Sequence, residues 1–185
     1  MQSMEHKNYG APAWLTTPLL LRLTKAVCVG AIGLLAALIA FGNLTDYGSN
    51  YAFVSHVLAM DTTFPASQVH YRSIHSPWVY HTAYGVIILA EAAMAGCCLR
   101  GSWDLVRALR AGAAAFHQAK RWGVAGILLG ILIWFVGFEV IGGEWFAMWQ
   151  SASWNGLGAA ERVLSFLMLT LILLHLPESD NQPSN

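Results

Sequence analysis

Glu91 is the residue of greatest chemical interest, because it is an acid within the apolar run GVIILAEAAMAGCC. A carboxylate at the centre of a bilayer costs about 2.5–3.5 kcal/mol on insertion scales. We therefore expect Glu91 to be neutral or to be hydrogen-bonded inside a helix bundle, with Ser165, Thr170 or Trp134 as its partner. Such an acid acts either as a proton relay or ligand group, or as a polar clamp between helices, and the sequence favours neither.

A second candidate region is residues 137–156, GFEVIGGEWFAMWQSASWNG, which is unusually rich in tryptophan for a connecting link. Tryptophan concentrates at membrane interfaces, which accounts for its aromatic side chains but not for its polar ones. We expect this segment and the region around His56 to form a cap that contacts a ligand or a partner. The candidate cap residues are His56, Asp61, Glu144, Trp145, Trp149, Gln150, Trp154, Asn155 and Arg162.

Glu139 and Arg162 lie near the outer ends of two neighbouring apolar runs. Unpaired charges at that depth are costly, so we expect these two side chains to form an ion pair across the bundle rather than to act in catalysis.

The seven histidines raise the question of a haem or a metal ion. A bis-histidine haem needs two ligands at one depth on facing helices, whereas His81 and His175 belong to opposite ends of the bundle. No metal-type spacing of cysteine or histidine is present, so we expect neither a haem nor a metal ion and assign no metal ligand. The sequence leaves the cofactor unknown. An outer metal site would have to use His56, His75 and His81 with Asp61 or Glu144.

Four long apolar runs must position all these groups. The chain of 185 residues is 56% hydrophobic and 11% charged, where about 25% charged is usual in globular proteins. A span takes about 20 residues, and in lipid its backbone must be paired internally, as it is in a helix. The sequence therefore predicts an all-α bundle of four transmembrane helices within a 19–176 domain, with a lead at 1–18 and a tail at 177–185. The predicted spans are residues 19–41, 78–99, 122–141 and 157–176.

The lysines and arginines predict the orientation of these spans, because cytoplasmic links are enriched in both. They cluster before and at the start of the first span and between the second and third, at Lys7, Arg22, Lys25, Arg100, Arg107, Arg110, Lys120 and Arg121. Both termini and the central link are therefore expected in the cytoplasm. The other two links are then expected to be structured and periplasmic.

The links and spans carry further local signals. In the first outer link we expect a short helix that is capped by Asn50 and ended by Pro65, too short to cross the bilayer. Residues 100–121 read as an amphipathic helix, with Leu105, Leu109 and Phe116 facing lipid. The glycines of GILLG, at positions 126 and 130, should let another helix approach closely.

Three strings, FGNLTDYGSNYAFVSHVLAMDTTFP, AEAAMAG and GGEWFAMWQSASWNG, resemble the bacterial predicted small integral membrane proteins grouped as domain of unknown function 2165. The resemblance extends over nearly the whole chain. It implies a multi-pass protein of the bacterial inner membrane, and it transfers no catalytic residue because the family has none established.

We therefore interpret the chain as a non-catalytic accessory or partner-binding component of the bacterial inner membrane. Its partners are the lipid bilayer and, on this interpretation, another membrane protein, with no nucleic acid. One alternative is a redox or lipid- and quinone-handling protein with a polar site under the outer cap. Another is an oligomeric transporter that uses Glu91. The sequence determines neither the ligand nor the oligomeric state.

Overall fold

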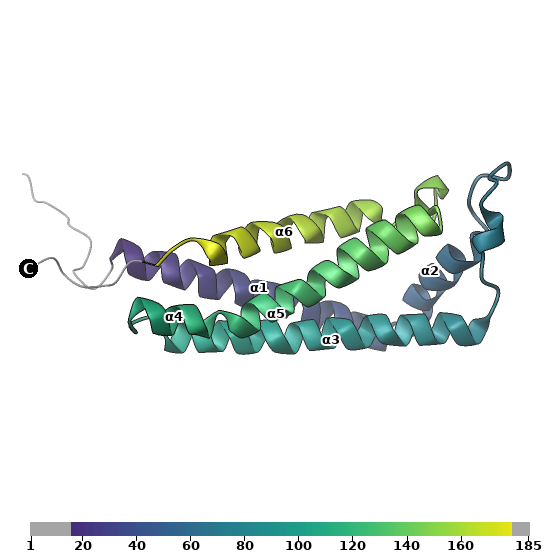
Figure 1. The fold of residues 1–185 in the computed structure, drawn as a ribbon. Helices are drawn as coiled ribbons and strands as arrows, with labels where there is room; N and C mark the ends of the chain where they lie inside the picture. Colours follow the sequence, from purple (N-terminus) through teal and green to yellow (C-terminus); the bar gives the residue numbers. More distant parts are fainter. Residues whose placement is uncertain (1–15, 179–185) are drawn as a thin grey trace, which may run out of the picture.

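The computed structural model describes residues 16–178, and over this range the chain folds as the predicted all-α bundle with four helices long and apolar enough to cross a membrane (Figure 1). The predicted lead and tail fall mostly outside the described residues. The spanning helices are α1 (Thr17–Thr45), α3 (Pro77–Arg107), α5 (Arg121–Ile131) with its continuation η2 (Leu132–Trp145), and α6 (Leu157–His175). The shorter elements are α2 (Tyr47–Ala59), η1 (His70–Arg72), α4 (Ala113–Ala119) and η3 (Met148–Gln150).

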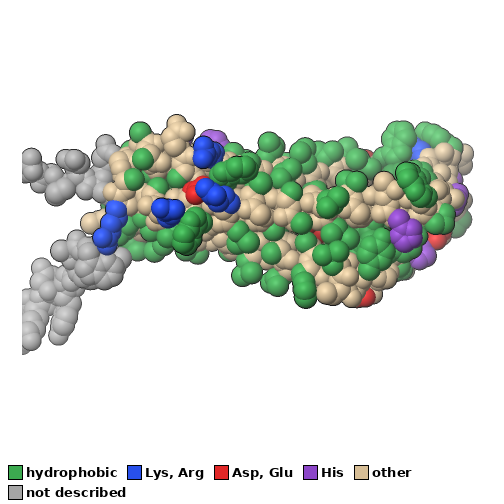
Figure 2. All heavy atoms as spheres, turned by 90° about the horizontal axis from the view of Figure 1, so that it is seen from below, with side chains coloured by type: hydrophobic (Ala, Val, Ile, Leu, Met, Phe, Trp, Pro, Cys, Tyr) green, Lys and Arg blue, Asp and Glu red, His purple; other side chains and the backbone are tan. Residues whose placement is uncertain are grey.

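The two ends of the bundle differ in composition. The start of α1, the end of α6 and helix α4 lie at one end, which we call the basic end, while α2 and the two outer links lie at the other, which we call the cap end (Figure 1). Most of the lysines and arginines in view lie toward the basic end and most of the histidines toward the cap end, with a largely apolar surface between them (Figure 2). This is the distribution expected of a membrane-spanning bundle.

The prediction of a separate amphipathic helix at residues 100–121 is wrong. Helix α3 continues to Arg107, and α4 is a distinct short helix after a break. Leu105 and Phe116 are fully buried in the core instead of facing lipid. The reason is the close packing of Gly101 against the backbone of Gly123, which brings α3 and α5 together at the basic end.

Glycines set the spacing of the helices, as the GILLG motif predicted. Gly126 lies against Cys98 of α3, and a Cβ on Gly130 would stand 2.8 Å from both Met94 of α3 and Leu167 of α6. Without a hydrophobic force between helices in lipid, such close backbone approach is a main source of packing energy.

Helix α2 follows α1 directly after a bend at Asp46 and does not span the bundle. Two details of the prediction are wrong: α2 begins before Asn50, which therefore does not cap it, and it ends at Met60 rather than at Pro65. Met60 adopts a left-handed conformation, φ 54°, which stops the helix by turning the chain.

The third span changes its hydrogen-bonding pattern half-way. After Ile131 the chain forms a π-helix of 14 residues, which ends where the amide of Phe146 donates to the carbonyl of Ile141 at 3.0 Å. π-Helices usually extend over a single turn and occur often at functional sites. The prediction of a uniform span over residues 122–141 did not anticipate this change.

Candidate functional site

The two outer links fold together into one cap. The amide of Phe64 donates to the side-chain oxygen of Gln150 at 3.2 Å, and the hydroxyls of Thr62 and Ser151 are 2.7 Å apart. Beneath these polar contacts, Met60, Phe146 and Ala147 form a small buried cluster of their own. The two links are structured, as predicted, and they form one unit over the end of the bundle, which the sequence had left open.

His56 and Asp61 form a hydrogen-bonded pair on this cap. Nδ1 of His56 lies 2.7 Å from a carboxylate oxygen of Asp61, and the imidazole stacks on Trp154 with ring centres 4.5 Å apart. Both side chains are more than a third exposed. The pair therefore lies on the exposed surface of the cap. Asp61 and Trp154 set the orientation of the imidazole.

The remaining predicted cap residues are dispersed over the cap. Trp149 meets Phe64 edge-on at 5.9 Å, and Trp145 lies under the guanidinium of Arg72 at 4.8 Å. Asn155 accepts a hydrogen bond from the amide of Leu157 at the start of α6. These contacts shape the cap, and they do not converge on one polar centre.

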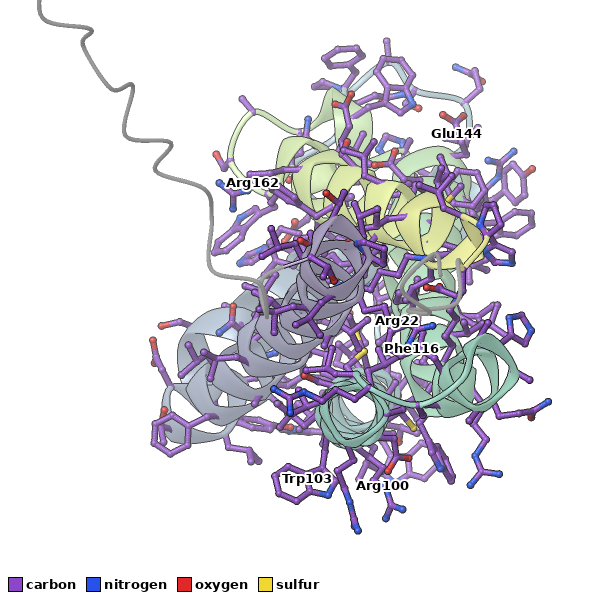
Figure 3. All side chains as sticks on the ribbon, turned by 90° about the vertical axis from the view of Figure 1, so that its left-hand side faces the viewer. Arg22, Arg100, Trp103, Phe116, Glu144 and Arg162 are labelled. Atoms are coloured by element: carbon purple, nitrogen blue, oxygen red, sulfur yellow. The ribbon has the colours of Figure 1, made fainter. Side chains whose placement is uncertain are left out.

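The backbone carbonyl of Glu144 accepts a hydrogen bond from Arg72 within the cap. The carboxylate of Glu144 takes part in none of the ion pairs within residues 16–178. The predicted Glu139–Arg162 pair is wrong, because none of the ion pairs within residues 16–178 joins the two. Arg162 is exposed on α6 and lies well apart from Glu144 in a view along the bundle (Figure 3). The pairing was deduced from a common depth at the ends of two spans, and depth alone does not bring two side chains to facing sides of their helices.

The outer histidines have separate partners. His81 lies 2.8 Å from the hydroxyl of Tyr47, His75 lies 3.1 Å from Ser73, and His70 lies 2.8 Å from Thr63. Within the described part of the chain, no three histidine, cysteine or acidic side chains come close enough to hold a metal ion.

The main cavity described for the bundle is an apolar groove that the sequence did not indicate. It has a volume of about 500 Å³ and lies between α2, α3 and the α5–η2 span, directly beneath the cap cluster. Only apolar side chains and glycines line it. The lining residues Val86, Leu132 and Ile141 are 59%, 50% and 46% exposed, so the groove opens sideways, toward the surface that lipid would cover.

The π-helix accounts for the apolar wall of this groove. On this segment the lining residues are spaced both four and five positions apart: Leu132, Ile133, Gly137, Phe138, Ile141, Gly142 and Phe146. In an α-helix, residues five apart point about 140° away from each other, since each residue turns the helix by 100°. The i to i+5 hydrogen-bonding pattern brings them to one face instead.

Glu91 has a partner that the sequence analysis missed. It is buried, 2% exposed, and its carboxylate accepts a hydrogen bond of 2.7 Å from the side-chain amide of Asn43 near the end of α1. The hydroxyl of Tyr84, two turns earlier on the same face of α3, donates to the backbone carbonyl of Asn43 at 2.9 Å. The predicted partners on the third and fourth spans are therefore wrong. Asn43 fell outside the predicted first span, which is why it was not considered.

A second buried polar cluster lies at the basic end. Nζ of Lys25 and of Lys120 lie 2.5 and 2.7 Å from the carboxylate of Glu178, and Nε of Arg22 lies 3.7 Å from it. All four side chains are at most 7% exposed. Arg22 stacks on buried Phe116, whereas Arg100 points outward (Figure 3).

The three cations of this cluster also bind helix ends. Lys120 and Lys25 donate to the carbonyls of Leu174 and Leu176 at the end of α6, and Arg22 donates to carbonyls in the link after α3. Cations are favourable at such helix ends. Burial alone would raise the pKa of Glu178, but hydrogen bonds and charge from Lys120 and Lys25 outweigh burial and hold the pKa below its usual value.

The four apolar helices, the polar ends and the sideways-opening groove define a small polytopic integral membrane protein. Residues 21–177 match the family described as predicted small integral membrane protein (DUF2165), so the chain belongs to this family, as its strings suggested. No curated protein and no solved structure matches the chain.

Proposed function

We propose that this protein is a non-catalytic accessory component of the bacterial inner membrane that holds one lipid chain in the groove between α2, α3 and η2. The observation that carries the proposal is the wholly apolar lining of a groove that opens sideways at membrane depth. This function develops the lipid-handling alternative from the sequence, with the site below the cap instead of among the polar cap residues.

The volume of the groove favours a chain over a partner helix. Ligand pockets commonly measure roughly 300–1,000 Å³, and 500 Å³ falls in this range. A helix is about 10 Å wide with its side chains, so a partner helix would enter this groove only with the side chains of one face. A lipid chain is narrow enough, and it enters from the bilayer without crossing water.

The polar cluster around Glu91 supports a structural role for this acid. Its hydrogen bond to Asn43 joins α1 to α3, and Tyr84 of α3 binds the Asn43 backbone in return. These are the contacts of an interhelical clamp, which would keep one wall of the groove in place beside Ala90, a lining residue.

The proposal includes an orientation, with the basic end in the cytoplasm and the cap in the periplasm. It rests on the positive charges at the basic end. Single cysteines at Asp61 and Gln150, introduced after replacement of the native cysteines, should both react with an impermeant thiol reagent added to intact cells. A cysteine at Gln118, on α4, should react only after the membrane is opened. Labelling of Asp61 and Gln150 from opposite sides would contradict the fold as well as the orientation.

The groove itself is tested with a lipid that carries a photoactivatable diazirine in its acyl chain. We expect cross-links to concentrate on peptides that contain Val86 and Ile141, two exposed lining residues on opposite walls. Ala83→Phe places a ring in the groove from α3 and should remove most of these cross-links.

Ala93→Phe is the matched control, because Ala93 is exposed on the same helix and does not line the groove. It should leave the cross-links unchanged. Equal labelling of the lipid-facing surfaces of α1 and α6, or full labelling in Ala83→Phe, would overturn the proposal.

A further inference from the structure

We infer that the lipid held in the groove is anionic, with a phosphate headgroup bound by Arg72. This inference rests on the proposed function and adds the class of ligand to it. It is carried by the placement of Arg72 on the segment that covers the outer end of the groove.

Arg72 lies beside the mouth of the groove. Its Nη1 donates to the carbonyls of Glu144 and Trp145, 3.4 and 3.3 Å away, at the end of η2, and the next residue, Phe146, lines the groove. On the other side, the amide of Ile74 donates to the carbonyl of Leu58, another lining residue. The segment that carries Arg72 is therefore tied to two groove walls.

The charge of Arg72 is available for an anion. Its guanidinium lies over the rings of Trp145 and Tyr71, and Nε donates to the Tyr71 hydroxyl at 3.2 Å. All these acceptors are uncharged, and no carboxylate of residues 16–178 pairs with Arg72. These hydrogen bonds leave Nη2 for a further acceptor. Two aromatic rings hold the guanidinium plane, so that Nη2 can donate a charge-assisted hydrogen bond to a phosphate oxygen from a fixed position.

Selectivity in this site must come from the headgroup. Lipid tails are as apolar as the groove wall, so a chain gains packing on entry but little discrimination between lipids. A basic side chain attracts an anionic lipid by about 1 kcal/mol, which corresponds to a preference of about five-fold. Tyr71 and Trp145 are strongly exposed beside Arg72, as expected for rings at headgroup depth.

The test uses two photoactivatable lipids with the same diazirine-labelled chains, phosphatidic acid and diacylglycerol, and the full chain in nanodiscs. The two lipids differ only by the phosphate. We expect phosphatidic acid to label the groove peptides about five-fold better than diacylglycerol. Arg72→Gln should reduce this ratio to about one, while Arg72→Lys should retain most of it. Arg162→Gln, which removes an exposed cation at the cap end away from the groove, should leave the ratio unchanged.

The outcomes separate the two proposals. If neither lipid labels the groove, the proposed function fails. If both label it equally well, or the preference survives in Arg72→Gln, the chain site stands and the headgroup inference is overturned. Diacylglycerol labelling reports on the integrity of the groove in each variant. If Arg72→Gln loses this labelling, Arg72→Met, which keeps an apolar side chain without the charge, decides: a ratio near one supports the inference, and a ratio near five overturns it. Displacement of the lipid by glycerol 3-phosphate would assign Arg72 to a soluble phosphate and overturn the lipid assignment.

Discussion

Replacing Glu178 by glutamine should destabilise the bundle far more than an ordinary surface substitution. The carboxylate neutralises part of the charge of Arg22, Lys25 and Lys120, whose side chains are 1%, 3% and 7% exposed. Removing one partner of a buried ion pair typically costs about 3–5 kcal/mol, because the other charge stays buried without compensation. The amide of glutamine still accepts one hydrogen bond, and backbone carbonyls still serve both lysines. We therefore expect a loss near the lower limit, about 3 kcal/mol.

The measurement is reversible unfolding in mixed micelles of a mild detergent and dodecyl sulfate, followed by circular dichroism. Asp104→Asn is the matched control, since it is also a carboxylate-to-amide change at the basic end. Its partner Arg100 is 61% exposed and the pair is four residues apart on one helix, so its loss should cost at most about 0.5 kcal/mol. If Glu178→Gln loses no more free energy of unfolding than Asp104→Asn, the cluster does not clamp the helices.

The same unfolding assay checks three further predictions. Because the pKa of Glu178 is lowered in the folded protein, its contribution to the free energy of unfolding is fully present above the unfolded pKa of about 4.3 and is lost as pH falls through the folded pKa. Glu178→Gln should therefore weaken the fall of stability at acid pH. Asn43→Leu strands the buried carboxyl of Glu91 and should cost about 1–3 kcal/mol, part of which Glu91→Leu should restore in the double variant; strictly additive losses would contradict the clamp. Gly101→Ala should cost about 1–3 kcal/mol because its methyl group meets backbone of α5, whereas Gly96→Ala, with nothing within 4 Å, should be neutral or stabilising; equal effects would refute the close approach.

Hydropathy was sufficient to predict the four helices and their order, because a bilayer leaves the backbone few alternatives. It was less informative about helix ends. α1 and α3 have 29 and 31 residues, about 44 and 46 Å at 1.5 Å per residue, against a hydrocarbon core of about 30 Å. The excess turns carry polar residues such as Asn43, which hydropathy assigns to links. For this reason the sequence analysis did not identify Asn43 as the partner of Glu91.

The sequence did not predict the burial of the basic residues. Arg22, Lys25 and Lys120 fit the charge rule for cytoplasmic ends, and that rule treats them as solvated. In the structure they are buried around Glu178, because the ends of α3 and α6 supply carbonyls that only tertiary packing brings within reach. A single acid after the last span, such as Glu178, does not by itself indicate a buried ion cluster. Considering this acid together with the three cations at the same depth on other helices would have indicated such a cluster.

The groove could not be read from the sequence because it depends on where close packing stops. Gly101, Gly126 and Gly130 hold α3 against the third span over its first half. Beyond Gly130 the third span carries leucine, isoleucine and tryptophan, and it diverges from α3 toward the cap end, where α2 enters (Figure 1). The π-helix therefore has space on its α3 side and directs apolar residues into it. A void of this size would be costly in water; if a lipid chain fills the groove in the bilayer, as proposed, the open groove is the stable arrangement.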